Sequence, residues 1–278
     1  MRIKYVLIEK LNRLTSKEME LFLYICRYQQ LNGTMSGLHN QDVCKETGMC
    51  KQSFYNALNG LEKKGILDVR KLSEIDYDVV IRNNDFSYEE AFHEGYINLS
   101  RDVFRTKQFK KLAAKEKWML FYFLHCTHEE SGSYRIGVQK FYAKFCALLG
   151  VSKRRVRAFL HKLRHFFSIG IKDRLYYITY KHSVFHGTQS GQETIEHEHF
   201  TSSMARRSKI RKTESKELKD TAALIKQYRE TAKQLKENIY RLLEESIRES
   251  VEGTERPLDR TLSAKFVHKI LRRKLYLA

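Results

Sequence analysis

Residues 48–67 read GMCKQSFYNALNGLEKKGIL and decide the predicted fold. Phe54, Ala57, Leu58 and Leu61 recur at the spacing of one helix face, which predicts a helix over about 51–64. Glycine adopts a left-handed backbone without strain, so the glycines at the two ends predict a tight turn before this helix and a stop after it. A strand over 66–70 and a return strand over 78–82 are expected to follow.

The residues before this stretch predict two more helices. A short helix is expected over about 40–47, directly before the turn. An amphipathic helix is expected from about residue 16, because Thr15 and Glu18 have the spacing of a capping box. The unit therefore consists of a helix, a short helix, a tight turn, a helix and a strand pair.

The same unit occurs a second time in the chain. Residues 14–24 read LTSKEMELFLY, and residues 112–122 read LAAKEKWMLFY. Further on, GMCKQSF at 48–54 aligns with GVSKRRV at 150–156. We therefore expect a second short helix over 139–149, a helix over about 153–167 with Ser152 as its N-cap, and strands around Ile169 and over 175–180.

Both units resemble the winged helix-turn-helix family of DNA-binding domains. The resemblance covers about residues 1–186 and depends most on Thr47-Gly48-Met49 and on the ending LEKKGIL at 61–67, which is typical of bacterial regulators. Cys50 departs from the pattern, because the family prefers a Ser or Thr cap there. The resemblance implies a mainly α fold with small β-wings. The expected division is winged-helix domain 1 over 1–95, winged-helix domain 2 over 96–186, a basic flexible linker over 187–213 and a helical tail over 214–278.

The net charge indicates a polyanionic partner. The 278 residues include 52 Lys and Arg against 33 Asp and Glu, for a formal charge of +19. Such a surface attracts DNA or RNA first and an anionic membrane second. A basic protein without a nucleic-acid role is the alternative. The hydrophobic content of 42% is enough to build packed cores, so wholesale disorder is excluded.

The resemblance implies that the third helix of each unit enters the major groove and that the wing touches the backbone or the minor groove. The second of these helices suits the task, because Arg bonds guanine in bidentate fashion and Lys and Arg neutralise phosphates. An ordinary solvated basic face is the alternative. The expected DNA contacts of this unit are Lys153, Arg154, Arg155, Arg157, His161, Lys162 and Arg164 on the helix, with Lys172 and Arg174 on the wing.

The first recognition helix carries less charge and more amide side chains, which suit adenine edges. Its wing contains Glu74, Asp76 and Asp78, which phosphates would repel, so this wing is not expected to lie against DNA. A protein-binding role for the first unit is the alternative. The expected contacts are Lys51, Gln52, Ser53, Tyr55, Asn56 and Asn59.

Beyond residue 186 the hydrophobic periodicity is lost until about residue 214. The cluster Arg206, Arg207, Lys209, Arg211 and Lys212 predicts either a flexible arm that tracks phosphates or a solvated linker. From 214 to 251 a 3-4 apolar spacing predicts one long helix, which either forms a homodimer as a coiled coil or packs back on the winged domains. A last helix is expected from about Asp259.

Two motifs resemble catalytic motifs of enzymes that act on DNA. HKLRH at 161–165 is similar to a motif of tyrosine recombinases, and HEH at 197–199 is similar to the paired histidines of nicking enzymes. Neither has its companion motifs, and no phosphate-binding loop of the GxxxxGK[ST] type occurs. We therefore expect no enzyme, no cofactor and no metal site, with a tyrosine-dependent nicking or recombining enzyme as the minor alternative.

The remaining expectations concern location and role. Five scattered cysteines suit a reducing cytoplasm, no signal peptide is evident, and the apolar run at 118–124 is too short to span a bilayer. The sequence predicts a cytoplasmic double-stranded DNA-binding protein that acts as a transcriptional regulator, without a membrane partner. The alternative is a plasmid or mobile-element replication initiator that binds short DNA repeats.

Overall fold

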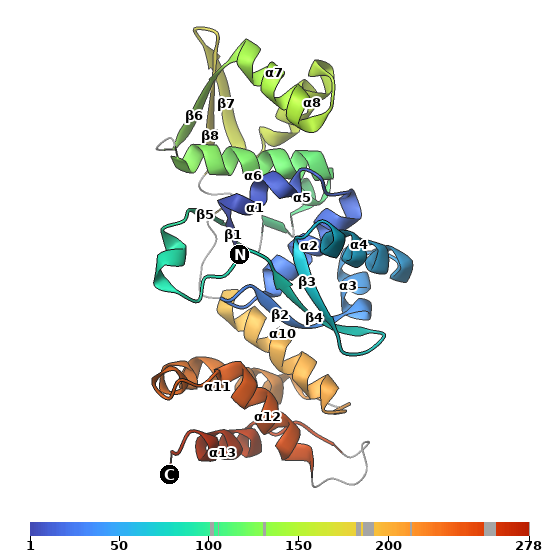
Figure 1. The fold of residues 1–278 in the computed structure, drawn as a ribbon, viewed down its shortest axis with the longest axis vertical. Coiled ribbons are helices and arrows are strands. Elements are labelled where there is room, and N and C mark those ends of the chain that lie inside the picture. Colours follow the sequence, from blue (N-terminus) through green and yellow to red (C-terminus); the bar gives the residue numbers. More distant parts are fainter. Residues whose placement is uncertain are drawn as a thin grey trace.

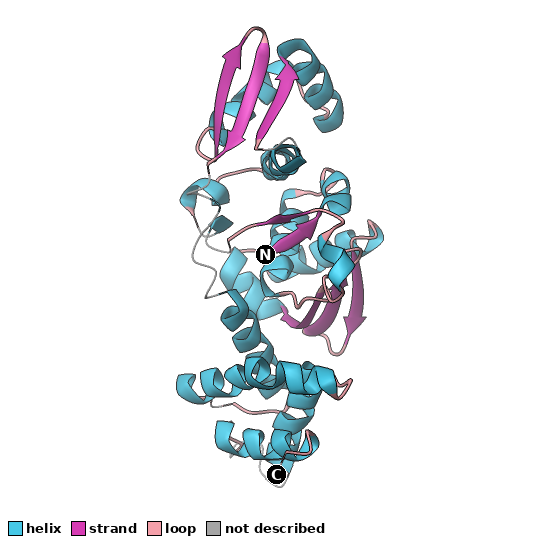
Figure 2. Ribbon diagram, turned by 90° about the vertical axis from the view of Figure 1, so that its left-hand side faces the viewer, coloured by secondary structure: helices cyan, strands magenta, loops and turns pink. Residues whose placement is uncertain are grey.

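The computed structural model describes residues 1–278 except 101–102, 105, 130–131, 182–184, 186–191, 212, 253–259 and 278. The described chain is mainly helical and contains small antiparallel sheets. We call residues 16–81 the first unit, residues 114–180 the second unit and residues 192–277 the helical module. In Figure 1 the second unit lies at the top, the first unit in the middle and the helical module at the bottom, and Figure 2 shows the same order from the side.

The first unit combines three helices with a three-stranded sheet in the order β2-β4-β3. Strands β3 and β4 form the expected hairpin, with Leu67 opposite Ile81 and Lys71 opposite Tyr77. The apolar stripe predicted for the third helix is buried beneath it. The elements are α2 (Ser16–Tyr28), β2 (Thr34–His39), α3 (Asn40–Thr47), α4 (Lys51–Lys63), β3 (Leu67–Lys71) and β4 (Asp76–Ile81).

The second unit repeats the same elements in the same order, and its sheet order β6-β8-β7 matches that of the first. The sequence analysis does not predict one strand in each unit, β2 and β6. Gly37 lies within β2 and Gly137 ends β6, and glycine weakens the local signal for a strand. The elements are α6 (Ala114–Glu129), β6 (Ser133–Gly137), α7 (Val138–Leu149), α8 (Lys153–Leu163), β7 (Phe167–Lys172) and β8 (Leu175–Tyr180).

The predicted turns and helix caps are present in the structure, with one exception. Gly48 and Gly150 both take the left-handed conformation that ends the short helix, with φ of 70° and 59°. The capping box of Thr15 and Glu18 is present. Ser152 occupies the N-cap of α8, but its side chain makes no capping hydrogen bond, so that part of the prediction is wrong.

A shared core joins the two units. Helix α1 packs on α6, and the buried Trp118 indole donates a hydrogen bond of 2.7 Å to the Ile8 carbonyl. Strand β5 pairs with the N-terminal β1, so the boundary predicted at 95–96 separates two residue ranges that share one sheet. The joining elements are β1 (Arg2–Lys4), α1 (Tyr5–Leu11), a 3₁₀ turn (Glu89–Phe92), β5 (Tyr96–Asn98) and α5 (Lys107–Lys110).

The predicted flexible linker over 187–213 is wrong for most of its length. Residues Gln192–Arg207 form helix α10, which packs against β2 and α2 of the first unit. Phe200, Met204 and Ala205 are buried, and their spacing gives the helix an apolar face. The sequence analysis does not predict this face. Residues 187–191 of the predicted linker and the basic residue Lys212 lie outside the described residues.

The long helix predicted over 214–251 is two helices, α11 (Ser215–Gln234) and α12 (Ile239–Glu252). The chain turns between them, where Lys236 takes a φ of 57° and the Asn238 side chain accepts a hydrogen bond of 2.9 Å from the Tyr240 amide. The apolar stripe expected to pair two copies is instead buried inside the helical module. Helix α13 (Ala264–Lys274) begins later than predicted, and Asp259 lies outside the described residues.

In the part of the chain that the structure describes, no helix combines the length and the apolar character needed to cross a bilayer.

Candidate nucleic-acid interface

Helix α8 separates its apolar and cationic side chains completely. Val156, Phe159, Leu160 and Leu163 are buried against the second unit. The opposite face is therefore turned outward, as the sequence predicts. The exposed side chains of the set expected to contact DNA are Lys153, Arg154, Arg155, Arg157, His161, Lys162 and Arg164.

Lys162 forms an ion pair that the sequence does not predict. Its ammonium group lies 2.8 Å from a carboxylate oxygen of Glu116, which comes from α6 and is 3% exposed. The two residues are 46 positions apart, so the sequence around Lys162 gives no sign of this pair. In the first unit Lys64 pairs with the buried Glu18 in a similar way. Lys162 thus neutralises a buried acid, and it is the member of the set least available to a ligand.

The wing of the second unit is a tight hairpin. Lys172 pairs with Leu175, and the two residues between them, Asp173 and Arg174, have φ of 50° and 59°. Two successive left-handed residues make the turn type that fits the twist of a two-residue hairpin. The turn leaves Lys172 and Arg174 exposed at its tip, on the unit that carries α8.

Helix α4 exposes an amide face. Lys51, Gln52, Asn56 and Asn59 are exposed. The Gln52 amide donates a hydrogen bond of 3.0 Å to the Asn56 side chain one turn later, so the two amides are held side by side. An aligned pair of this kind presents both donors and acceptors to a ligand edge.

Two residues predicted on this face have structural partners. Tyr55 is half-buried, and its hydroxyl donates to the Glu74 carbonyl at 2.9 Å and accepts from Asn40 at 3.0 Å. It therefore ties α4 to α3 and to the first wing. Ser53 is also half-buried and lies 3.1 Å from the Cys50 sulfur. Both side chains thus have contacts within the protein, unlike the exposed Lys51 and Asn59.

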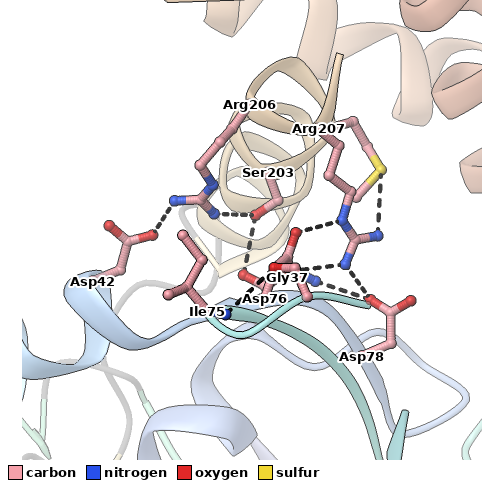
Figure 3. Close-up of polar contacts among 10 residues, drawn as sticks. Gly37, Asp42, Ile75, Asp76, Asp78, Ser203, Arg206 and Arg207 are labelled. Atoms are coloured by element: carbon pink, nitrogen blue, oxygen red, sulfur yellow. Dashed lines mark hydrogen bonds and ion pairs between the residues drawn. The ribbon is translucent and has the colours of Figure 1, made fainter. Parts of the chain in front are cut away.

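The acids of the first wing have internal partners. Arg207 of α10 reaches Asp76 at 2.9 Å and Asp78 at 2.6 Å, and Arg206 reaches Asp42 at 2.6 Å. Figure 3 shows both guanidinium groups projecting from α10 toward these carboxylates. Glu74 pairs with Lys71 at 2.5 Å. These ion pairs neutralise the acids. Arg206 and Arg207, two cations of the predicted arm, therefore hold α10 on the first unit.

Gly37 allows α10 to approach the sheet closely. It takes a φ of 75°, and a side chain there would collide with Ser203 of α10. Its amide donates a hydrogen bond of 3.0 Å to Asp78, the same carboxylate that Arg207 binds. The glycine and the ion pairs therefore form one joint, which we call the α10 joint (Gly37, Asp42, Asp76, Asp78, Ser203, Arg206 and Arg207).

Replacing Arg207 with Met is expected to destabilise the α10 joint. The change leaves Asp76 and Asp78 close together without their shared cation, and charged hydrogen bonds of this kind contribute about 1.5–3 kcal/mol. We expect the free energy of unfolding to fall by about that amount in urea titrations. Arg211→Met, at an exposed position after α10, is the matched control. Equal stability of the two variants would show that the ion pairs do not hold the joint.

His39, beside the α10 joint, is expected to make the stability of the protein sensitive to acid. Its ring is 5% exposed, and burial and the neighbouring Arg206 lower the pKa of the imidazole, against an opposing effect of Asp42 and Asp76. A folded-state pKa below the unfolded value means that stability is full above about pH 6.5 and is lost as the pH falls below it. We expect His39→Gln to flatten the fall in melting temperature on acidification. His161→Gln, at an exposed position, should leave that fall unchanged.

The two histidines of the HEH motif are packing residues. His197 lies 3.1 Å from the Arg229 guanidinium, and the His199 ring stacks on Tyr28 with centroids 4.4 Å apart. Both come from α10, within the segment that the sequence predicts as a flexible linker. Among the described residues, no group of three or more His, Cys, Asp or Glu side chains has the arrangement of a metal site.

The two candidate helices lie on one edge of the molecule. In Figure 1, α8 and α4 both lie on the right-hand side, one above the other along the long axis. The shared core around Trp118 fixes their units relative to each other. Lys209 and Arg211, the two exposed members of the predicted arm within the described residues, follow the C-terminal end of α10.

Comparison with models of known protein families gave no match, and a search of curated proteins gave none either.

Proposed function

We propose that this chain binds double-stranded DNA through two tandem winged-helix domains, over 1–95 and 96–186, and acts as a transcriptional regulator. In this proposal α4 and α8 are the recognition helices and enter major grooves of one duplex. The wing of the second unit follows the backbone with Lys172 and Arg174. No cofactor is required.

The observation that carries the proposal is the unpaired charge of α8. Among the described residues, none of the exposed Lys153, Arg154, Arg155, Arg157 and Arg164 forms an ion pair. Four of these cations lie on the exposed side of α8 and the fifth is its C-cap, and such a concentration of positive charge attracts an anionic ligand. A DNA duplex carries phosphates at a spacing that several cations engage together, with release of condensed counterions.

The two helices divide the work in this proposal. The α8 face supplies most of the affinity through phosphates and through arginine contacts to guanine. The α4 face supplies specificity through Gln52, Asn56 and Asn59, since amide groups pair with adenine edges. The alternative of a protein-binding first unit has less support, because its acids are bound by α10 and its exposed face is mainly amide.

A replication initiator of a plasmid or mobile element is the second candidate, because two rigidly joined units suit binding to short repeated sites. Direct repeats beside an origin next to the gene would favour the initiator, and a single operator at a promoter would favour the regulator. A homodimer through residues 214–251 is not part of the proposal, because the required stripe is buried in the helical module.

The test is selection of bound duplexes from a randomised pool, followed by gel-shift titration of the enriched sequence. We expect an enriched motif that the protein binds in preference to a shuffled duplex, with affinity that falls steeply as salt rises. Equal binding of shuffled duplex, single-stranded DNA and RNA would contradict sequence-specific reading of a duplex.

A further inference from the structure

The outer face of α13 combines apolar and cationic side chains. The inner face buries Val267, Ile270 and Leu271 against the rest of the helical module. On the outer side Phe266 is 48% exposed and Leu277 is 36% exposed. Large apolar side chains left in solvent next to one another mark a surface that binds a partner.

These side chains line a groove of about 580 Å³. The chain turns back after α13, where Tyr276 takes a φ of 56° and the Leu277 amide donates a hydrogen bond of 2.9 Å to the Arg272 carbonyl. Leu277 follows the C-terminal end of α13 and Phe266 lies in its first turn, so the lining residues span the length of the helix. The lining residues are Ser263, Lys265, Phe266, His268, Lys269, Arg272, Arg273 and Leu277.

The cations of α13 differ in their partners. Arg273, which also lines the groove, and Lys274 pair with Glu249 of α12, so they hold the helix in the module. Lys265, Lys269 and Arg272 line the groove and have no ion pair among the described residues. The groove is therefore apolar in part and positively charged along its side, and a ligand complementary to it is acidic with apolar anchors.

The position and chemistry of the groove favour a protein over DNA. In Figure 1, α13 lies at the bottom of the molecule, away from α4 and α8 on the right-hand side. Phosphates gain nothing from exposed Phe and Leu side chains, whereas an amphipathic helix places apolar residues into such a groove. A lipid surface is disfavoured, because the main apolar face of α13 is already buried in the module.

We propose that this face of α13, between Phe266 and Leu277, is a docking groove for an acidic amphipathic helix of a partner protein. Apolar side chains of the partner contact Phe266 and Leu277, and its Asp and Glu side chains pair with Lys265, Lys269 and Arg272. The proposal is independent of DNA binding, because the groove shares no residue with α4 or α8.

The test is fluorescence anisotropy of the full-length protein with a labelled synthetic peptide that has a leucine stripe at helical spacing and glutamates on both flanks. We expect saturable binding, little binding of a scrambled peptide of the same composition, and about tenfold weaker binding by Phe266→Ser and by Lys269→Glu. Lys140→Glu, an exposed charge reversal on α7, should bind the peptide like the unaltered protein.

Several results would overturn the proposal. They are absence of peptide binding, equal binding by Phe266→Ser and Lys269→Glu, and displacement of the peptide by duplex DNA or by vesicles containing phosphatidylserine. Thermal unfolding of both variants should match that of the unaltered protein, because both side chains are exposed. If Phe266→Ser is less stable, Lys269→Glu alone decides the outcome.

Discussion

The double substitution Arg154→Ala and Arg155→Ala is expected to weaken binding of the selected duplex by about 100-fold or more, because each lost contact to a base or phosphate is worth about 1–3 kcal/mol. Both side chains are exposed on α8 and form no ion pair among the described residues. Their removal therefore leaves no buried group without a partner, and the fold should keep its stability within about 0.5 kcal/mol.

The salt dependence separates this effect from a general loss of charge. Each phosphate contact that is lost reduces the slope of log affinity against log salt by about one. The matched control is Lys226→Ala with Lys233→Ala, two exposed cations of α11 whose removal changes the net charge equally. Unchanged affinity of the Arg154 and Arg155 variant in gel-shift titrations would refute the assignment of α8.

The substitution Trp118→Ala is expected to lower the free energy of unfolding by about 3–5 kcal/mol. The indole is 2% exposed and packs against Tyr122 and Phe145. Its ring nitrogen donates to the carbonyl of Ile8 at 2.7 Å, so the change also leaves that buried carbonyl without its donor. The loss falls on the core that joins the two units, and urea unfolding followed by circular dichroism measures it.

Trp118→Phe is the matched variant, because it keeps an aromatic ring and removes the hydrogen bond. We expect Trp118→Phe to lower the free energy of unfolding less than Trp118→Ala does, because phenylalanine leaves a smaller cavity than alanine. Val6→Ala, at a residue of α1 that is 55% exposed, should have a small effect. A loss of less than about 1 kcal/mol for Trp118→Ala would contradict the view that this residue fixes the units together.

Much of the element order was predictable because local signals were strong. Gly48 and Gly150 mark the left-handed turns, and the apolar spacing in 51–64 and 153–163 defines the inward faces of α4 and α8. Because the two units repeat one pattern, the elements predicted in one unit support those predicted in the other. By contrast, the glycines of β2 and β6 weaken the local signal, and these segments become strands by pairing with β4 and β8.

The errors in the candidate site come from contacts between distant residues. Lys162 and Glu116 are 46 positions apart, and Arg207 and Asp78 are 129 apart, so local spacing gives no sign of either pair. The helical character of α10 was hidden because its buried face includes polar residues such as Thr201 and Ser203. Proximity in the fold, and not residue type, determines which cations remain available.

The most direct test of duplex recognition by α4 and α8 is a hydroxyl-radical footprint on the selected duplex. We predict two protected tracts on one face, about one helical turn or a multiple of it apart. The Arg154 and Arg155 variant should lose protection in one tract, and Gln52→Ala with Asn56→Ala should lose it in the other. A footprint that is absent, or that neither pair of substitutions alters, would contradict the account.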